Sequence, residues 1–176
     1  EVIALIPDLL NRHVSALVLF TSWRQLNAVI SGLPKTLAEG LLVQGEGSKQ
    51  ALLQEHRQRI DEGQSSYLFG VASFSEGLDL PGEYCRHVVI VKLPFSVPDD
   101  PVDQAIAEWA EAQGRNAFYE ISVPDASLKL VQACGRLIRS EKDYGTISML
   151  DKRIVTQRYG RALIESLPPF RLDLPA

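Results

Sequence analysis

The sequence predicts an α/β fold in which a mainly parallel sheet is doubly wound, with helices on both of its faces. Five short apolar segments have the length and composition of buried strands, and segments with helical periodicity alternate with them. A chain of 176 residues with 45% hydrophobic content is long enough for one well-packed domain. We therefore expect a single domain over residues 1–176, because strands alternating with helices favour crossover connections.

The first elements follow from the pattern of apolar side chains. Apolar residues at helical spacing predict a helix over Val2–Leu10, and the aliphatic run Ala16–Phe20 predicts a buried strand. Ser22 is suited to cap the next helix, which extends through about Ser31. A second short strand is expected at Leu41–Val43.

The middle of the chain repeats this alternation. The segment Gly45–Lys49 contains Gly-x-Gly-Ser-Lys but lacks the order of a phosphate-binding loop, so we interpret it as an ordinary loop. A helix is expected over Lys49–Ile60, with Gly63 in the position that usually follows a helix. Buried strands are expected at Tyr67–Ala72 and at His87–Lys92, which is rich in β-branched residues.

The last third of the chain supplies three helices and a fifth strand. The helices are expected over Asp103–Gln113, Ala126–Arg139 and Tyr159–Leu167, and the strand over Thr146–Leu150. In the first of these helices, Ile106, Trp109 and Ala110 are expected to face inward. Asp125 or Ser127 is expected to cap the second.

The helix expected over Ala126–Arg139 carries a polar edge. Gln132, Arg136 and Arg139 have the spacing i, i+4 and i+7, which places them on one side, opposite the apolar residues. Arginine suits a planar anion such as a phosphate, and Gly135 leaves room for a close partner. The alternative from spacing alone is an ordinary amphipathic helix with solvated arginines.

Two strand ends carry further polar residues. Thr21 and Ser22 lie where a strand meets a helix, a position that can hold a phosphate or serve only as a helix cap. Glu76 and Asp79, with Gly77 between them, follow another strand, at the edge where open α/β sheets bind ligands. Both segments are therefore candidate site elements.

Composition limits the classes of partner. The formal charge is −4, but residues 129–161 alone carry +5 and the remainder −9, which favours an anionic ligand or a solvated basic face there. The apolar runs are far shorter than the roughly 20 residues of a membrane span, so no membrane partner is expected. Cys85 and Cys134 suggest neither a disulfide framework nor a metal set, which fits the cytoplasm.

Three motifs in order resemble those of one helicase branch. The sequence Gln-x-x-Gly-Arg-x-x-Arg at Gln132–Arg139 resembles the last motif of superfamily 2 helicases, and Ser140–Gly145 with Asp151–Arg153 narrows the resemblance to the XPD/DinG branch. Ser73–Gly82 resembles the preceding motif, and Phe20–Gln25 resembles motif four. The resemblance covers essentially the whole chain and is closest to the bacterial DinG helicases.

This resemblance implies a RecA-like domain, the second motor domain of an ATP-dependent DNA helicase, and therefore a fragment of a longer protein. It implies unwinding with 5′ to 3′ polarity in DNA repair or replication. Arg136 and Arg139 would act as arginine fingers at the γ-phosphate. The other implied site residues fall into two groups. Nucleotide contacts would come from Gln132, Glu76, Gly77 and Asp79, and contacts with DNA from Thr21, Ser22, Trp23 and Ser73.

The chain lacks part of the chemistry that an ATPase needs. No Walker A sequence and no Asp-Glu-Ala-His-like box is present, so the chain is not a complete ATPase. The resemblance implies that ATP and Mg²⁺ are bound mainly by an N-terminal RecA-like domain of the same protein, which in this family can carry an iron-sulfur cluster. We assign no cluster and no metal ligand to this chain. The expected partners are single-stranded and duplex DNA, ATP and that first domain, in the bacterial cytoplasm.

Two other functions remain open at this point. The first is a DinG-like motor domain associated with a nuclease, and the second is a nucleotide- or nucleic-acid-binding module without turnover. The sequence upstream of Glu1 discriminates between them, because a Walker A motif there favours a motor and an acidic exonuclease motif favours the nuclease.

Overall fold

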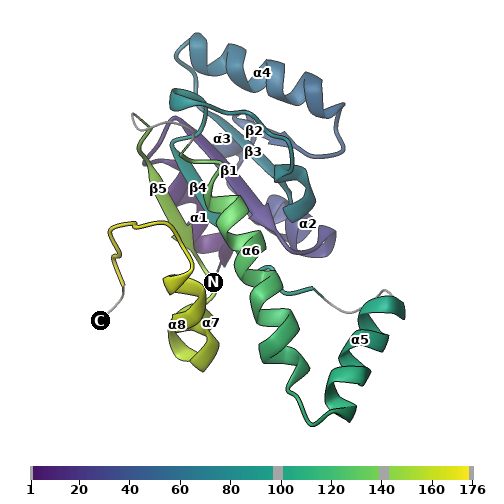
Figure 1. Cartoon of the computed structure of the whole chain (residues 1–176). Helices are drawn as coiled ribbons and strands as arrows, with labels where there is room; N and C mark the ends of the chain where they lie inside the picture. The colour runs from purple at the N-terminus through teal and green to yellow at the C-terminus, as the bar shows by residue number, and fades with distance from the viewer. Residues whose placement is uncertain (1, 97–100, 139–142, 175–176) are drawn as a thin grey trace. The chain divides into compact units, whose positions relative to one another are not determined.

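The structure is a computed structural model that describes residues 2–96, 101–138 and 143–174. The chain divides into two compact units (Figure 1). The first unit comprises Glu1–Lys92 and Ala133–Asp151, and the second comprises Leu93–Gln132 and Lys152–Ala176.

The first unit is built on a parallel sheet. The described residues form five strands, namely β1 (Ser15–Phe20), β2 (Leu41–Val43), β3 (Ser66–Val71), β4 (His87–Ile90) and β5 (Thr146–Met149). Their order across the sheet is β2-β3-β1-β4-β5, and every neighbouring pair is parallel. The predicted strands are therefore confirmed, with ends that differ by one or two residues.

The sheet is covered on both faces. Ala16, Val18 and Phe20 of β1 belong to a buried cluster with residues from α1 (Val2–Leu10), α2 (Trp23–Gly32) and α3 (Lys35–Ala38). Ser66 of β3 faces the opposite side, where it bonds His56 of α4 (Lys49–Asp61) at 2.8 Å. Because every residue of β1 is buried, its unbroken apolar run matches the pattern of a strand packed on both faces.

The helix ends of this unit follow the expected capping chemistry. The Ser22 hydroxyl accepts a hydrogen bond from the Gln25 amide at 3.3 Å, so Ser22 is the N-cap of α2 as predicted. At the end of α4, Gly63 has a φ of 75°, and its amide donates to the Ile60 carbonyl at 2.9 Å. The Gln64 amide donates to the Arg59 carbonyl at 2.8 Å, which completes a Schellman motif.

The second unit is helical. Its elements are α5 (Pro101–Ala112), the π-helix Phe118–Ser122, most of α6 (Val123–Cys134), α7 (Arg153–Thr156) and α8 (Arg158–Glu165). The rings of Phe95, Phe118 and Tyr159 form a cluster with centroids 5.2 to 5.4 Å apart. The Arg153 guanidinium lies 5.6 Å from the Phe95 ring. Aromatic contact therefore holds the segments on either side of α6 together within this unit.

The predicted boundaries of α6 are wrong at both ends. The helix begins at Val123, directly after the π-helix Phe118–Ser122, so Asp125 and Ser127 lie inside it and neither is its cap. Asp125 instead pairs with Lys129 at 2.8 Å. The helix ends at Cys134, just before Gly135. Glycine is a poor helix former, and the chain continues in turns instead.

The end of α6 also removes the expected polar edge. The Arg136 amide donates to the Ala133 carbonyl at 3.1 Å, and the Leu137 amide donates to the Cys134 carbonyl at 3.0 Å, which are contacts of turns between residues three apart. Arg136 therefore lies beyond the helix and does not share a helical face with Gln132. Arg139 and Ser140–Lys142 lie outside the described residues.

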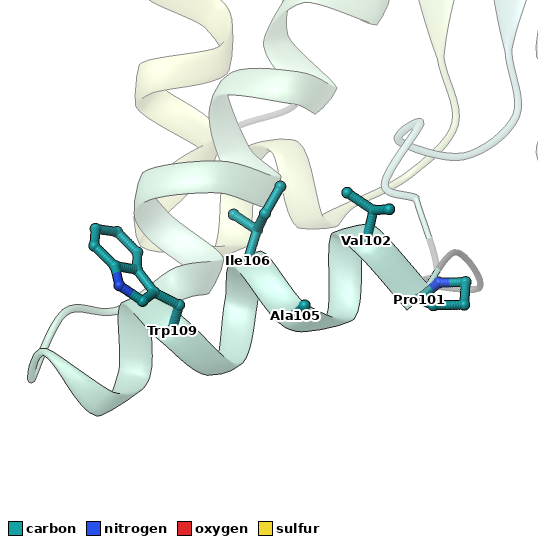
Figure 2. Close-up of a pocket in the computed structure, with 5 residues that line it drawn as sticks. All are labelled: Pro101, Val102, Ala105, Ile106 and Trp109. Atoms are coloured by element: carbon teal, nitrogen blue, oxygen red, sulfur yellow. The ribbon is translucent and has the colours of Figure 1, made fainter.

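The expected inward face of α5 is also wrong in part. Ala110 is buried, but Ile106 is 46% exposed and Trp109 is 59% exposed. Figure 2 shows Ile106 and Trp109 along one side of α5 with Val102, where they line a groove. The spacing of apolar residues thus identified the apolar face of the helix, but spacing alone does not determine whether another segment covers that face.

Candidate functional site

The candidate site lies in the first unit, at the carboxyl ends of its strands. Strands β1 and β3 are parallel neighbours, and Phe20 is paired with Val71 at their carboxyl ends. The segments that follow these two strands, 21–23 and 72–79, therefore start side by side at the same edge of the sheet. This is the edge at which open α/β sheets bind ligands.

The segment after β1 is open to solvent. Thr21, Ser22 and Trp23 are all exposed, and Trp23 keeps 46% of its surface accessible. A side chain added at Gly45, in the loop after β2, would meet the Trp23 ring at 3.7 Å. The ring thus lies against that loop on one side while retaining exposed surface, which suits it to stacking.

The segment after β3 begins with a short 3-10 helix, Ala72–Ser75. Ser73 is exposed, whereas Phe74 is buried. A side chain at Gly70 of β3 would come within 2.5 to 2.7 Å of Phe74, so glycine is required where the phenyl ring packs onto the strand. This packing anchors the start of the segment, a role of Gly70 that was not predicted from the sequence.

The loop that follows has a tight turn at Gly77. Its φ is +68°, a left-handed conformation that favours glycine. Apart from its two chain neighbours, no atom of the described residues lies within 4 Å of the place where a side chain would begin. Glu76 and Asp79 are exposed, and Leu78 between Gly77 and Asp79 is fully buried. The predicted nucleotide residues Glu76, Gly77 and Asp79 therefore lie on one exposed loop with a buried leucine anchor.

Arg136 contacts this loop. Its Nη1 donates a hydrogen bond to the Leu78 carbonyl oxygen at 3.1 Å, and the arginine is half-buried. The two contacting residues are 58 positions apart in the chain. The structure therefore brings together the two segments that carry the last two predicted motifs.

Two further predicted residues belong to the last motif, Gln132 and Arg139. Gln132 is exposed near the end of α6 and belongs to the second unit. Arg139 lies outside the described residues. Their expected roles at the nucleotide remain predictions.

Two basic side chains of α4 also contact the loop, and sequence reasoning missed them. The Lys49 ammonium donates to the Glu76 carbonyl, and Arg57 Nη2 donates to the Asp79 carbonyl at 2.5 Å. The only sequence signal is that a crossover helix with basic residues precedes this strand and loop. That signal is weak because periodicity does not specify which backbone groups a long side chain reaches.

Other chemical features of the described part of the chain are modest. No cluster of three or more His, Cys, Asp or Glu suited to a metal ion is found among the described residues. Cys85 and Cys134 are free and buried, and burial raises the pKa of the Cys134 thiol to about 12, which disfavours the reactive thiolate. In the same described ranges, no helix is long and apolar enough to cross a membrane.

The parallel sheet, its two covered faces and the loops at its carboxyl edge define a RecA-like α/β fold. Two solved structures support this fold. An apo XPD structure aligns with a TM-score of 0.73 at 22% identity, over 93% of this chain and 33% of that chain. An XPD helicase structure aligns with a TM-score of 0.70 at 21% identity, over 94% of this chain and 30% of that chain.

The chain belongs to the helicase C-terminal domain family, whose model matches residues 8–170. It is 48% identical over 169 residues to the ATP-dependent DNA helicase DinG of Photobacterium profundum, covering 94% of this chain and 24% of that protein. It is 39% identical over 165 residues to DinG of Escherichia coli K12, covering 94% of this chain and 23% of that protein. The chain thus spans about a quarter of the length of the curated relatives it matches. The predicted family and the predicted RecA-like fold are confirmed.

Proposed function

We propose that the chain is the second motor domain of an ATP-dependent DNA helicase, acting in a longer protein with 5′ to 3′ polarity. The single observation that carries the proposal is the hydrogen bond from Arg136 to the Leu78 carbonyl at 3.1 Å. This contact joins the arginine-bearing segment to the glycine-bearing loop at the ligand-binding edge of the sheet. A solvated surface arginine is expected to be exposed, whereas Arg136 is half-buried at this edge.

At the nucleotide, Arg136 changes its hydrogen-bond acceptor during the cycle of ATP binding and hydrolysis. A phosphate oxygen is a stronger acceptor for a guanidinium than a neutral carbonyl, because the hydrogen bond is then charge-assisted at both ends. Arg136 therefore leaves the Leu78 carbonyl for the γ-phosphate when a first motor domain closes over ATP. Arg139 is the second finger, Gln132 contacts the nucleotide or couples it to DNA, and the exposed loop of Glu76, Gly77 and Asp79 lines the cleft.

The first, N-terminal RecA-like domain holds most of the ATP and its Mg²⁺. This assignment follows from the absence of a Walker A sequence and an Asp-Glu-Ala-His-like box in the 176 residues. Any iron-sulfur cluster belongs to that domain as well, since the two buried cysteines of this chain do not fit a four-cysteine site. No step of the reaction is assigned to a metal in this chain.

On the DNA side, the exposed segment after β1 and the neighbouring Ser73 form part of the path of a single strand. Hydroxyl groups and backbone amides at a helix start suit a phosphate, and an exposed indole suits a base, so Thr21, Ser22 and Trp23 provide both kinds of contact. The longer protein acts on DNA in repair or replication in the bacterial cytoplasm.

The experiment that tests this function is the change Arg139→Lys in the longer protein. An arginine finger is worth about 10³ to 10⁵ in rate, and lysine keeps the charge but loses the planar fork. DNA-stimulated ATP turnover should fall at least about a hundredfold, with ATP binding much less affected. The matched control is Arg158→Lys, at an exposed arginine of α8. Near-normal turnover in Arg139→Lys would overturn the proposal.

A further inference from the structure

Basic side chains hold the backbone of the Glu76–Asp79 loop. Lys49, at the start of α4, donates to the Glu76 carbonyl, and Arg57, two turns later, donates to the Asp79 carbonyl at 2.5 Å. Together with the bond that Arg136 makes to the Leu78 carbonyl, three basic side chains contact three carbonyls within four residues.

We propose that Lys49 and Arg57 are positioning residues that fix this loop in the conformation in which it meets the nucleotide. The proposal deepens the proposed function and rests on it for the identity of the ligand. Neither residue touches the nucleotide in this role. Each acts through the main chain on either side of the turn at Gly77.

The loop needs such support because packing does not supply it at the turn. Within the described part of the chain, only the two chain neighbours come within 4 Å of a side-chain position at Gly77, and glycine has the largest conformational freedom of any residue. The flanking side chains of Glu76 and Asp79 are exposed. Hydrogen bonds from cations to the carbonyls on both sides of Gly77 therefore restrict the segment that packing leaves free.

The main-chain contacts matter more than the ion pair. Arg57 Nη2 lies 3.8 Å from the Asp79 carboxylate, and the two side chains are 41% and 72% exposed. Solvent screens such a pair, so it contributes little. The hydrogen bond from Arg57 to the Asp79 carbonyl instead holds the backbone, and the Asp79 carboxylate stays at the surface.

Helix α4 is a rigid support for these two side chains. Leu52 and His56 lie between Lys49 and Arg57 in the sequence, and both are buried. His56 Nε2 donates to the Tyr84 carbonyl at 2.7 Å, and its Nδ1 accepts from the Ser66 hydroxyl at 2.8 Å, because a carbonyl can only accept. The Arg57 guanidinium also lies 5.7 Å from the Tyr84 ring centroid. The donors that reach the loop therefore extend from a helix that is fixed to the sheet.

The first test measures hydrogen exchange in the 176-residue chain, which needs no assumption about function. In Arg57→Ala and Lys49→Ala, the amides of Glu76 and Leu78 should exchange about tenfold faster, the size expected for losing one charge-assisted hydrogen bond. These two amides donate to the Ser73 and Ser75 carbonyls at 3.2 Å, so they report directly on the loop.

Arg59→Ala is the matched control, and the conservative variants test the chemistry. Arg59 lies on the same helix, but its guanidinium donates to the Glu39 carbonyl at 2.7 Å and to Glu55, so its removal should leave the loop unchanged. Lys49→Arg and Arg57→Lys should restore much of the protection, because each keeps a cationic donor. Equal loop exchange in the Arg57→Ala and Arg59→Ala variants would overturn the positioning role.

The second test separates the two proposals in the longer protein. Arg57→Ala should raise KM for ATP about tenfold and change kcat much less, because a loosened loop must be ordered again on binding. Arg59→Ala should change neither constant. If Arg57→Ala speeds loop exchange but ATP kinetics stay normal, Arg57 does hold the loop, but the loop has no role at the nucleotide. Unchanged exchange would remove the positioning role whatever the kinetics.

Discussion

The two ends of the parallel sheet differ in chemistry. At the amino ends of the strands, Ser15 Oγ donates to the Glu83 carbonyl at 2.6 Å, and Ser15 and Ser66 are both fully buried. His87 starts β4 and shares a hydrogen bond of 2.8 Å with Ser148. At the carboxyl ends, the segments after β1 and β3 expose hydroxyls, carboxylates and an indole.

This difference indicates how the two ends are used. Buried, paired polar groups at the amino ends fix the sheet and offer no surface to a ligand. Exposed polar groups on short segments at the carboxyl ends contribute little to stability and remain available for binding. We therefore expect substitutions of polar side chains at the amino ends to change mainly stability, and those at the carboxyl ends to change mainly activity.

The largest expected effect is at the carboxyl edge. Arg136→Ala in the longer protein should reduce ATP turnover by about 10³, the lower range for an arginine finger. The thermal midpoint should change much less than the turnover, because Arg136 is only half-buried and its bond to Leu78 reaches a loop whose flanking side chains are exposed. Steady-state ATPase assays and thermal unfolding of the same samples would show this. A large loss of stability with a proportionate loss of activity would break the proposed division between the two ends.

The next largest effect is a loss of stability in acid that originates at the amino edge. Burial, with help from the nearby His13, lowers the pKa of His87 from 6.5 to about 4. The unfolded chain then binds a proton at a pH where the folded chain does not, so stability is full above pH 6.5 and falls as the pH drops toward 4. The loss should reach about 3 kcal/mol, at 1.36 kcal/mol per pKa unit.

Denaturant unfolding between pH 7 and 4 measures this dependence. His87→Gln removes the titrating ring, so its free energy of unfolding should fall less steeply over that range than that of the unchanged chain. The same slope in both proteins would show that His87 does not carry the effect. His13 and His56 also have lowered pKa values because of burial, and they account for part of the remaining slope.

A smaller effect is expected for DNA binding at the segment after β1. Replacing Ser22 and Trp23 together by alanine should weaken binding of single-stranded DNA by the longer protein about tenfold, since stacking is worth roughly 1–3 kcal/mol per base. Fluorescence anisotropy at two salt concentrations would measure it, and binding should fall steeply with salt. Unchanged affinity in the double variant would place the strand elsewhere. Leu174→Ala, at an exposed position, is a control that should bind normally.

The smallest predicted effect concerns the turn at Gly77. Gly77→Ala forces a side chain into a left-handed conformation and should cost about 1 kcal/mol of stability. The cost arises from the backbone alone, because space is open around the position. Chemical denaturation would measure it, with Gly47→Ala as a control at a glycine without a positive φ. An unchanged free energy of unfolding would show that the loop adjusts without cost.

The sequence predicted the sheet better than the helices that border it. Unbroken apolar runs such as Ala16–Phe20 have one stable environment, a strand covered on both faces, so their identity follows from composition. The end of α6 was missed because the periodicity of Gln132 and Arg136 continues past Gly135 although the hydrogen bonds do not. The inward face of α5 was missed at Trp109 because covering that face depends on other segments.

The sequence indicated the site residues whose own side chains form a motif, but not those that contact backbone carbonyls. Glu76, Gly77 and Asp79 were predicted from motif and strand end, and Arg136 contacts their loop, while their role at the nucleotide stays a prediction. Lys49 and Arg57 were not recognisable, because their partners are backbone carbonyls that exist in every sequence. Only the fold determines which carbonyls lie within reach.

The strand order has a consequence for how this domain is made. β1 lies at the centre of the sheet, yet both strands that flank it, β3 and β4, are synthesised about 50 and about 70 residues later. An emerging chain therefore exposes Ser15–Phe20, an apolar segment with two unpaired edges, for seconds at ribosomal elongation rates. Such segments are prone to pair with other chains. Among the described strands, β1 thus waits longest for its neighbours and gains most from shielding by chaperones.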